Sequence, residues 1–244
     1  MNSFLKLFVG FLLKWLAKIY LMRRQPCIIA VIGTTGRHWI KENVIEALRE
    51  KKFSARGNQK NFNAEIGLPL SILNLPSGEG TFIGWLNVLL EGIKKCFVLN
   101  KKQKEYLVLE MAIDQPEDMD YLLSIVNPQI AVFTTITMIY SENFEDLDEI
   151  SQEYKKLVKI LPQKGGLLIN NNDDERIREL ETLALCRVVS YGLKNPSDFT
   201  AKNIKKTVLG QQFELNNKRI EINRFGQHHI YAKVVGEIIK SQIN

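Results

Sequence analysis

The chain has 244 residues, 45% hydrophobic and 25% charged, which is enough for one sizeable hydrophobic core. Its three cysteines, Cys27, Cys96 and Cys186, are far apart and form no Cys-x-x-Cys pair, which argues against a disulfide framework and a zinc site and favours a reducing cytoplasm. Of the net charge of +6, residues 1–24 carry +5, from five basic side chains and no acid, and the remaining 28 basic and 27 acidic residues leave +1. This near-neutral body argues against a nucleic-acid-binding surface.

The N-terminal segment has the pattern of an amphipathic helix. At about 100° per residue, one side of the helix carries Lys6, Gly10, Lys14 and Lys18, and the other carries Phe4, Phe8, Phe11, Trp15 and Ile19. The longest uncharged run is too short to span a bilayer, and no signal-peptide cleavage site follows it. Two main interpretations of this helix remain open, and a membrane-spanning helix is a minor third one. The helix lies on an anionic membrane surface, helped by Arg23 and Arg24, or it packs on its own domain or a partner.

The stretch after this segment organises the rest of the chain. Residues 27–32 are apolar and partly β-branched, which predicts a strand buried on both faces. The turn Gly33-Thr34-Thr35-Gly36 follows, and apolar periodicity then predicts a helix over residues 41–48. A strand, a glycine turn and a helix start form the layout of a phosphate-binding loop, in which backbone N–H groups face an anion. An ordinary turn between a strand and a helix remains the alternative, because Gly-x-x-Gly alone is a weak signal.

The two residues after the turn differ from those of a working phosphate-binding loop. Such a loop has a Lys that reaches the β- and γ-phosphates, followed by a Ser or Thr whose hydroxyl binds Mg²⁺. Arg37 and His38 stand in these places. Arg37 keeps the positive charge but is planar and larger than an ammonium, whereas His38 is a poor ligand for Mg²⁺, which prefers oxygen. The fold signal is therefore intact while the chemical signal is altered.

Predicted helices and strands alternate through the rest of the chain. Helices are predicted at 82–97, 119–126, 144–161 and 231–243, with a shorter one ending near residue 73, and buried strands at 106–111, 129–135, 165–174 and 187–192. Short β segments are predicted at 201–208, 212–215 and 219–223, with Asn216-Asn217 as a hairpin turn. The pattern predicts an α/β fold, with a mainly parallel sheet flanked by helices and a small β-rich C-terminal part. The predicted units are the basic amphipathic helix, residues 1–24, and one domain over residues 25–244.

One carboxylate falls at a position where ligands bind. Glu110 stands at the end of the strand predicted over residues 106–111, which puts it at the carboxyl edge of the sheet. Open α/β sheets bind their ligands at this edge. A solvated strand end without a function is the alternative.

Several strings of residues together resemble the central, ATP-binding domain of the Mur ligases, most of all the branch that adds D-alanyl-D-alanine to a UDP-muramoyl peptide. They occur in order between residues 26 and 236, at 33–36, 61–70, 108–111, 119–122, 127–132, 171–174 and 226–228. The most specific string is Asn61-Phe62-Asn63-Ala64-Glu65-Ile66-Gly67-Leu68-Pro69-Leu70. The resemblance implies a P-loop NTPase-like Mur ligase central domain.

The resemblance also implies a reaction, cofactors and site residues. Members of the family join a carboxylate to an amine through an acyl phosphate made from ATP, and Mg²⁺ and cations hold the phosphates in line. ATP and Mg²⁺ are therefore the expected cofactors, in peptidoglycan precursor synthesis. The residues implied at the phosphates are Gly33, Thr34, Thr35, Gly36, Arg37 and His38, those near the base and ribose are Asn171 and Asp174, and the Mg²⁺ ligand is Glu110.

The departures from the family pattern fall on residues that handle phosphate or metal. The loop Lys is Arg37, the hydroxyl that binds Mg²⁺ is His38, and the metal-binding His after the third strand is Tyr140. In the ungapped register Tyr154 stands where the family has a carbamoylated Lys, and Lys155 lies about 100° further round the helix. These substitutions predict a catalytically impaired or inactive domain, a pseudoenzyme at the membrane surface that binds a partner or a nucleotide. No residue is assigned as catalytic.

Two other functions remain open. The chain is an active ATP-dependent acid–amino acid ligase if a separate chain supplies the C-terminal ligase domain, which the family begins near the position of Glu237. The family's N-terminal UDP-sugar domain has the amphipathic helix in its place. Alternatively, the chain is a nucleotide-free interaction module in which Trp39 fills the former phosphate cleft. The expected location is the cytoplasm, with peripheral attachment to an anionic inner membrane surface through residues 1–24, and no nucleic-acid partner.

Overall fold

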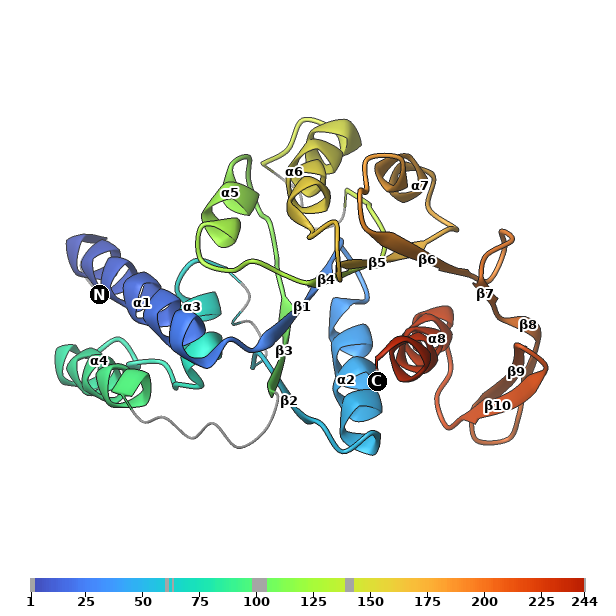
Figure 1. Cartoon of the computed structure of the whole chain (residues 1–244), viewed down its shortest axis with the longest axis horizontal. Helices are drawn as coiled ribbons and strands as arrows, with labels where there is room; N and C mark the ends of the chain where they lie inside the picture. Colours follow the sequence, from blue (N-terminus) through green and yellow to red (C-terminus); the bar gives the residue numbers. More distant parts are fainter. Residues whose placement is uncertain (1–2, 60–61, 63, 98–104, 139–142, 244) are drawn as a thin grey trace.

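The computed structural model describes residues 3–59, 62, 64–97, 105–138 and 143–243. Seven strands form one sheet in the order β2-β3-β1-β4-β5-β6-β7, and each neighbouring pair in it is parallel. Three more strands form a small antiparallel sheet in the order β10-β9-β8. Helices cover both faces of the large sheet, and the small sheet lies at one end of the molecule (Figure 1).

Strands and helices alternate over residues 27–192, apart from two consecutive helices, and four further strands over residues 199–222 precede the last helix. The helices are α1 (Ser3–Arg24), α2 (Arg37–Glu50), α3 (Gly67–Leu73), α4 (Phe82–Phe97), α5 (Asp118–Leu123), α6 (Leu147–Ile160), α7 (Glu175–Glu181) and α8 (Gln227–Gln242). The strands are β1 (Cys27–Ile32), β2 (Ser54–Gly57), β3 (Glu105–Glu110), β4 (Ile130–Phe133), β5 (Leu167–Asn171), β6 (Arg187–Gly192), β7 (Phe199–Thr200), β8 (Lys202–Lys206), β9 (Gln211–Leu215) and β10 (Lys218–Ile222).

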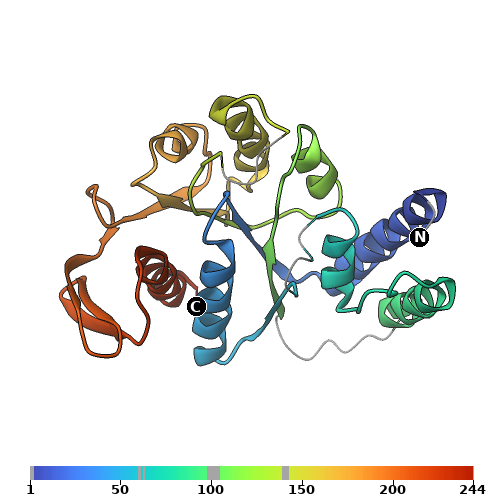
Figure 2. The ribbon, with the colours of Figure 1, turned by 180° about the vertical axis from the view of Figure 1, so that it is seen from behind.

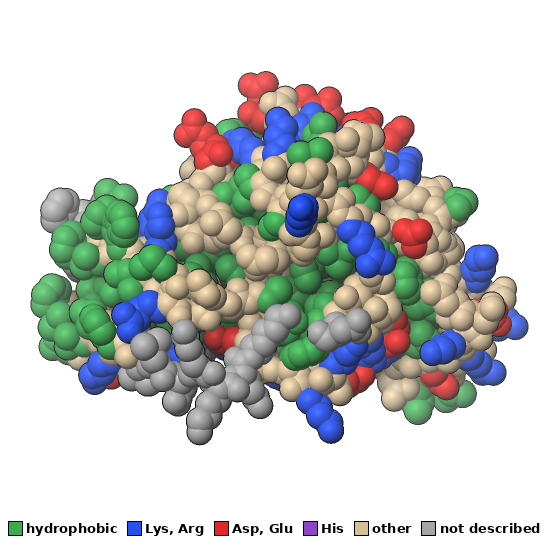
Figure 3. All heavy atoms as spheres, viewed as in Figure 1, with side chains coloured by type: hydrophobic (Ala, Val, Ile, Leu, Met, Phe, Trp, Pro, Cys, Tyr) green, Lys and Arg blue, Asp and Glu red, His purple; other side chains and the backbone are tan. Residues whose placement is uncertain are grey.

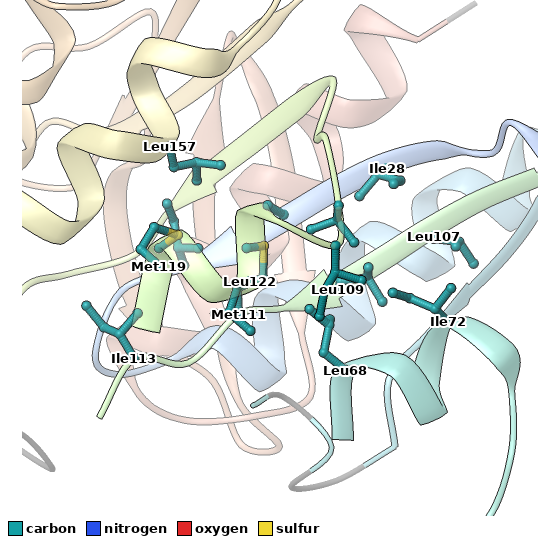
Figure 4. Close-up of a cluster of buried hydrophobic side chains, with 14 of the residues drawn as sticks. Ile28, Leu68, Ile72, Leu107, Leu109, Met111, Ile113, Met119, Leu122 and Leu157 are labelled. Atoms are coloured by element: carbon teal, nitrogen blue, oxygen red, sulfur yellow. The ribbon is translucent and has the colours of Figure 1, made fainter. Parts of the chain in front are cut away.

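The two faces of the large sheet bury separate apolar clusters. Along β1, Ile28, Ala30 and Ile32 belong to one cluster, whereas Ile29 and Val31 belong to the other, as the alternation of side chains along a strand requires. Figure 4 shows part of the first cluster, which α1, α3, α4, α5, α6 and α7 complete. Helices α2 and α8 pack together over the second cluster. Both faces are therefore covered, as the apolar strand residues predict.

The order of the strands places a crevice beside β1. After β1 the chain passes through α2 to β2, whereas after β3 it passes through α5 to β4 on the other side of β1. Such a reversal opens a crevice at the carboxyl ends of the two central strands, where open α/β sheets bind ligands. The loops after β1 and β4 meet there, and the Thr34 N–H donates to the Thr135 carbonyl at 2.7 Å.

The predicted α/β class, its parallel sheet and the hairpin at Asn216-Asn217 are confirmed, whereas the start of α2 and three short elements differ from the prediction. The hairpin at Asn216-Asn217 joins β9 to β10, and both residues have a positive φ, 49° and 64°. Helix α2 begins at Arg37, four residues before the predicted start, so Arg37 and His38 lie in its first turn. Strands β2 and β7 and helix α7 were not predicted, because segments of four, two and seven residues are too short to show periodicity.

Helix α1 has two apolar sides beside the basic one with Lys14 and Lys18, whereas the sequence predicts a single apolar side. One side is buried on the domain and contains Val9, Leu13, Ala17 and Tyr20. A second side is apolar and exposed and contains Phe8, Phe11, Trp15 and Ile19. The helix therefore packs on its own domain, while its aromatic side faces outward. The side chains of Phe4 and Lys6 lie outside the described residues.

Figure 2 shows α1, α3 and α4 grouped at one end of the large sheet, opposite the small sheet. Within the part of the chain that the structure describes, no helix combines the length and apolar character needed to cross a membrane.

Candidate nucleotide site

The loop between β1 and α2 is shaped by its two glycines. Gly33 has a φ of +123° and Gly36 a φ of +81°, conformations that residues with a Cβ rarely adopt. A Cβ at Gly33 would overlap the Thr134 hydroxyl and would lie 2.9 Å from the Thr135 carbonyl oxygen, whereas a Cβ at Gly36 would meet nothing within 4 Å. The loop therefore needs Gly33 for its close approach to the segment after β4.

Hydroxyl groups fasten the loop to the segment that follows β4. The Thr34 hydroxyl lies 2.7 Å from the Thr137 hydroxyl and accepts the Thr137 N–H at 2.9 Å. The Thr35 hydroxyl lies 2.8 Å from the Thr135 hydroxyl. The buried Thr134 hydroxyl, by contrast, has no hydrogen-bond partner among the described residues. Thr34 and Thr35 were predicted at the phosphates, and in this structure both hydroxyls have protein partners.

Arg37 turns back onto the loop that precedes it. Its guanidinium donates a hydrogen bond to the carbonyl of Gly33. Tyr154 of α6 lies beside it, fully buried, with its ring edge-on to Phe133 at a centroid distance of 5.7 Å. Burial raises the pKa of the Tyr154 hydroxyl to about 12, although the Arg37 charge and the Gly33 backbone act to lower it. The cation that replaces the loop Lys therefore interacts with the protein interior.

Glu110 stands at the carboxyl end of β3, at the predicted edge of the sheet. Lys41 of α2 is almost fully buried, and its ammonium lies 2.9 Å from a Glu110 carboxylate oxygen. It also donates to the Asn58 carbonyl at 2.8 Å. The Asn58 side chain in turn bonds to the backbone N–H and carbonyl of Glu110, at 2.9 and 3.0 Å. The imidazole of His38 is 3.7 Å from the same carboxylate oxygen.

The groups near Glu110 do not fit Mg²⁺. Mg²⁺ prefers several oxygen ligands in near-octahedral geometry. Glu110 offers one carboxylate, already paired with Lys41, and His38 offers nitrogen. Over the described ranges, no cluster of three or more His, Cys, Asp and Glu side chains is arranged to hold a metal ion. Tyr140, which takes the place of the family's metal-binding His, lies outside those ranges.

An open cavity of about 580 Å³ lies beside the loop, on the side of α8. It is lined by Thr35, Gly36, Trp39, Ile40, Thr134, Thr135, Asn171, Tyr191, Gln227, His228 and Tyr231. Its volume lies within the range of small-molecule sites, about 300–1,000 Å³. The cavity has apolar and aromatic walls with several polar groups, which is the composition of many small-molecule sites.

Two predicted base and ribose residues occupy different environments. Asn171 lies in the cavity wall, where its amide donates to the Thr134 carbonyl at 2.5 Å. Asp174 is outside that wall and caps α7 by accepting the Ile177 N–H at 3.2 Å. Its other oxygen accepts the Ile136 N–H at 2.8 Å. The carboxylate of Asp174 therefore holds the segment after β4 and the start of α7.

The neighbouring Asp173 has a structural role that the sequence analysis did not identify. Its carboxylate accepts the N–H groups of Leu193, Lys194 and Asn195 at 2.6–2.9 Å and the Tyr231 hydroxyl at 2.7 Å. Burial alone would raise the pKa of Asp173, but these hydrogen bonds hold it below its ordinary value. Asp173 thus fixes one wall of the cavity, because Tyr231 belongs to that wall.

Tyr191 and Tyr231 form the aromatic part of the cavity, and the sequence analysis missed both. The rings are edge-on with centroids 5.8 Å apart, and the Tyr191 hydroxyl donates to the Phe133 carbonyl at 2.7 Å. Burial raises the pKa of each hydroxyl well above its usual value. One signal was available, since Tyr191 stands near the carboxyl end of the strand predicted over residues 187–192.

Trp39 lies at the mouth of the cavity and does not close it. Its ring meets the His229 ring at a centroid distance of 4.4 Å, and the Arg224 guanidinium lies 4.7 Å from its centroid. Burial, with help from His228 and Arg224, lowers the pKa of His229. The open volume beside Trp39 shows that this indole does not fill the crevice.

A second, larger cavity of about 940 Å³ lies at the opposite edge of the large sheet. Residues at or near the amino ends of the strands line it, among them Cys27, Gln129, Leu167 and Arg187. Ligands of open α/β sheets bind at the carboxyl ends. The smaller cavity beside the loop is therefore the candidate nucleotide site.

Comparison with known proteins identifies the class. Residues 87–235 match the family described as the Mur ligase middle domain, and the chain belongs to this family. The resemblance to the central domain of the Mur ligases, which the sequence predicts, is thereby confirmed.

Among curated relatives, the UDP-N-acetylmuramoyl-tripeptide–D-alanyl-D-alanine ligase of Buchnera aphidicola subsp. Baizongia pistaciae is 24% identical over 221 residues, 89% of this chain and 42% of the relative. The ligase of the same name from Bacillus subtilis is 25% identical over 222 residues, with the same coverage of 89% and 42%. The chain thus spans less than half the length of these relatives.

Solved structures show the same fold. The MurF ligase of Thermotoga maritima in complex with ADP superposes with a TM-score of 0.73 at 21% identity, over 96% of this chain and 49% of that one. MurF of Acinetobacter baumannii superposes with a TM-score of 0.71 at 21% identity, over 95% of this chain and 45% of that one.

Proposed function

We propose that this chain is a Mur ligase middle domain that binds an adenine nucleotide mainly through its nucleoside and has impaired phosphate and metal handling. The observation that carries the proposal is the internal pairing of the charges needed for that handling. Arg37 donates to the Gly33 carbonyl, and Glu110 is paired with Lys41. The setting we propose is peptidoglycan precursor synthesis in the cytoplasm, in line with the names of the curated relatives.

Little unpaired positive charge faces a triphosphate at this loop. Phosphoryl transfer depends on cations and metal ions that face the β- and γ-phosphates. The guanidinium of Arg37 faces a backbone carbonyl and Tyr154 instead. A carboxylate that already has an ammonium 2.9 Å away attracts a second cation weakly. The nucleoside, in contrast, has an open cavity with aromatic walls.

Calorimetric titration of the chain with ATP, with and without Mg²⁺, tests this proposal. We expect measurable binding with little dependence on Mg²⁺, and no release of phosphate. Substituting Trp39→Leu should weaken binding by roughly tenfold, because an aromatic wall of the cavity is lost. The matched control is Phe225→Leu, which changes an exposed aromatic side chain that does not line the cavity. Tight binding that requires Mg²⁺, or steady phosphate release, would contradict the proposal.

An active ligase completed by a separate chain is the second candidate. The observation in its favour is the retained loop backbone, with positive φ at both Gly33 and Gly36, which leaves N–H groups at the start of α2 for a phosphate. Its test is phosphate release from ATP in the presence of UDP-N-acetylmuramoyl-tripeptide and D-alanyl-D-alanine. Release that depends on both substrates and disappears in Arg37→Ala would favour this candidate over the first.

A further inference from the structure

Helices α1 and α4 together expose a continuous apolar surface. On α1, Phe8, Phe11 and Trp15 are at least half exposed, and on α4, Leu86, Leu90 and Phe97 are 46–68% exposed. We refer to these six side chains as the α1–α4 face. Figure 3 shows hydrophobic side chains gathered over these two helices at one end of the molecule.

The two helices are held in place by other sides, so their exposed sides share one rigid platform. The Cys96 thiol donates to the Leu16 carbonyl at 3.3 Å, and Gly92 of α4 lies against Leu16 so closely that a Cβ there would be 3.1 Å from it. Trp85 and Val88 are buried on the inner side of α4. The α1–α4 face is therefore not needed for packing within the chain. Exposed apolar surfaces of this kind mark interaction sites.

The charged side chains that α1 and α4 themselves contribute are mostly positive. Lys14, Lys18 and Arg23 come from α1 and Lys94 from α4. Lys18 lies 5.1 Å from the Trp15 ring centroid, and Arg23 lies 5.7 Å from the Phe97 centroid. The sequences of the two helices contain one acid, Glu91, which is paired with Lys94 at 2.7 Å.

We propose that the α1–α4 face docks on an anionic lipid surface, with both helices lying in the plane of the interface. Aromatic and aliphatic side chains would enter the boundary between headgroups and acyl chains, and the flanking cations would meet lipid phosphates. A second copy of the chain complements this surface poorly, because it would bring the same cations together with one acid per copy. No residue of the face lines the nucleotide cavity, so the two functions are independent.

Sedimentation of the full chain with vesicles tests the proposal. The protein should co-sediment with vesicles of phosphatidylcholine mixed with phosphatidylglycerol, and much less of it should co-sediment with vesicles of phosphatidylcholine alone. The double change Phe11→Gln with Trp15→Gln should weaken partitioning at least roughly tenfold, and so should Leu90→Gln with Phe97→Gln. Gln keeps the helices intact, since its helix propensity is high.

Matched controls separate this face from exposed apolar residues in general. Leu185→Gln with Leu209→Gln changes two side chains that are 70% and 71% exposed on other segments, and it should leave partitioning unchanged. Lys18→Gln should weaken binding to the anionic vesicles roughly fivefold. Lys205→Gln on β8, a charge outside the face, should have little effect.

A spectroscopic readout locates the contact. Brominated lipids should quench Trp15, and the quenching should be lost in Trp15→Phe, since Trp85 is buried and Trp39 lies at the nucleotide cavity. The proposal is overturned if the chain does not bind to anionic vesicles, or if both double variants sediment with them as the wild type does. A dimer in solution that dissociates in the Phe11→Gln, Trp15→Gln variant would also overturn it and would assign the face to a second copy.

Discussion

The proposed phosphate side and the proposed nucleoside side of the site lie next to each other at one edge of the sheet, yet they are built differently. On the phosphate side, Arg37, Lys41 and Glu110 each contact a protein partner. On the nucleoside side, Tyr191 and Tyr231 border an open cavity of about 580 Å³. Both sides depend on loops at the carboxyl ends of the strands, so the fold alone does not explain the difference.

In the function that we propose, the site has lost its phosphate half and kept its nucleoside half. On the phosphate side, the Arg37 guanidinium donates to a backbone carbonyl and the Lys41 ammonium pairs with the Glu110 carboxylate, so both cations already have partners within the protein. The cavity depends instead on backbone hydrogen bonds, such as those from residues 193–195 to Asp173, which also hold the fold. The predictions below test these two halves separately, in order of decreasing effect.

The largest effect is expected from removing the buried partner of Glu110. Lys41→Met should lower the free energy of unfolding by about 4 kcal/mol, because it leaves a mostly buried carboxylate unpaired. The double variant Lys41→Met, Glu110→Gln should recover much of this loss. Urea unfolding measures both, and Glu42→Gln is the control, since Glu42 is half exposed and 3.3 Å from the same ammonium. An equal loss in the single and double variants would refute the pairing.

The loop glycines should differ in their sensitivity to substitution. Gly33→Ala should cost about 3 kcal/mol of unfolding free energy, because it adds steric overlap with the segment after β4 to a disfavoured φ of +123°. Gly36→Ala should cost about 1 kcal/mol, because only its φ of +81° is disfavoured. Thermal unfolding of the two variants checks the order. If Gly36 proved the more sensitive, the close approach at Gly33 would not govern the loop.

Asp173→Asn should show a pH-dependent loss of stability on the nucleoside side. The pKa of Asp173 is lowered in the folded chain, so its carboxylate stabilises the fold above the unfolded pKa of about 3.9, and this contribution disappears as the pH falls toward the folded value. The expected loss at neutral pH is about 1 kcal/mol, a modest amount because solvent screens the group.

Unfolding measured from neutral pH down to about pH 3 checks this difference between wild type and variant. The control is Asp148→Asn, whose carboxylate is 75% exposed and pairs with Arg176 at 3.1 Å. If the difference in unfolding free energy between wild type and Asp173→Asn stayed constant across this pH range, the charge of Asp173 would not be what stabilises the cavity wall.

Much of the fold was predictable from sequence, because segments such as 27–32 and 106–109 are apolar runs long enough to be recognised. The position of Glu110 at the sheet edge was predictable for the same reason. Its pairing with Lys41 was not, since these residues are far apart in sequence and meet only once β1 and β3 lie side by side. The third side of α1 was hidden too, because Leu13 and Trp15 are both apolar and only packing decides which is buried.

The direction in which Arg37 points could not be predicted either. A residue in the first turn of a helix can face the ligand or the loop, and the sequence contains no signal for that choice.

The smallest predicted effect concerns the orientation of Arg37. The double variant Arg37→Lys, His38→Thr should bind ATP roughly threefold more tightly than the wild type, because it restores an ammonium and a hydroxyl to the loop. Calorimetry with ATP and Mg²⁺ measures the gain.

The central claim is that the nucleoside side binds while the phosphate side contributes little, and one measurement tests it most directly. Adenosine and ATP are titrated into the wild-type chain under the same conditions. The two dissociation constants should lie within about tenfold of each other, since Arg37 and Lys41, the cations beside the loop, already have partners within the protein. ATP binding roughly a thousandfold tighter than adenosine would contradict the account, because the loop would then hold the phosphates in the manner of an active ligase.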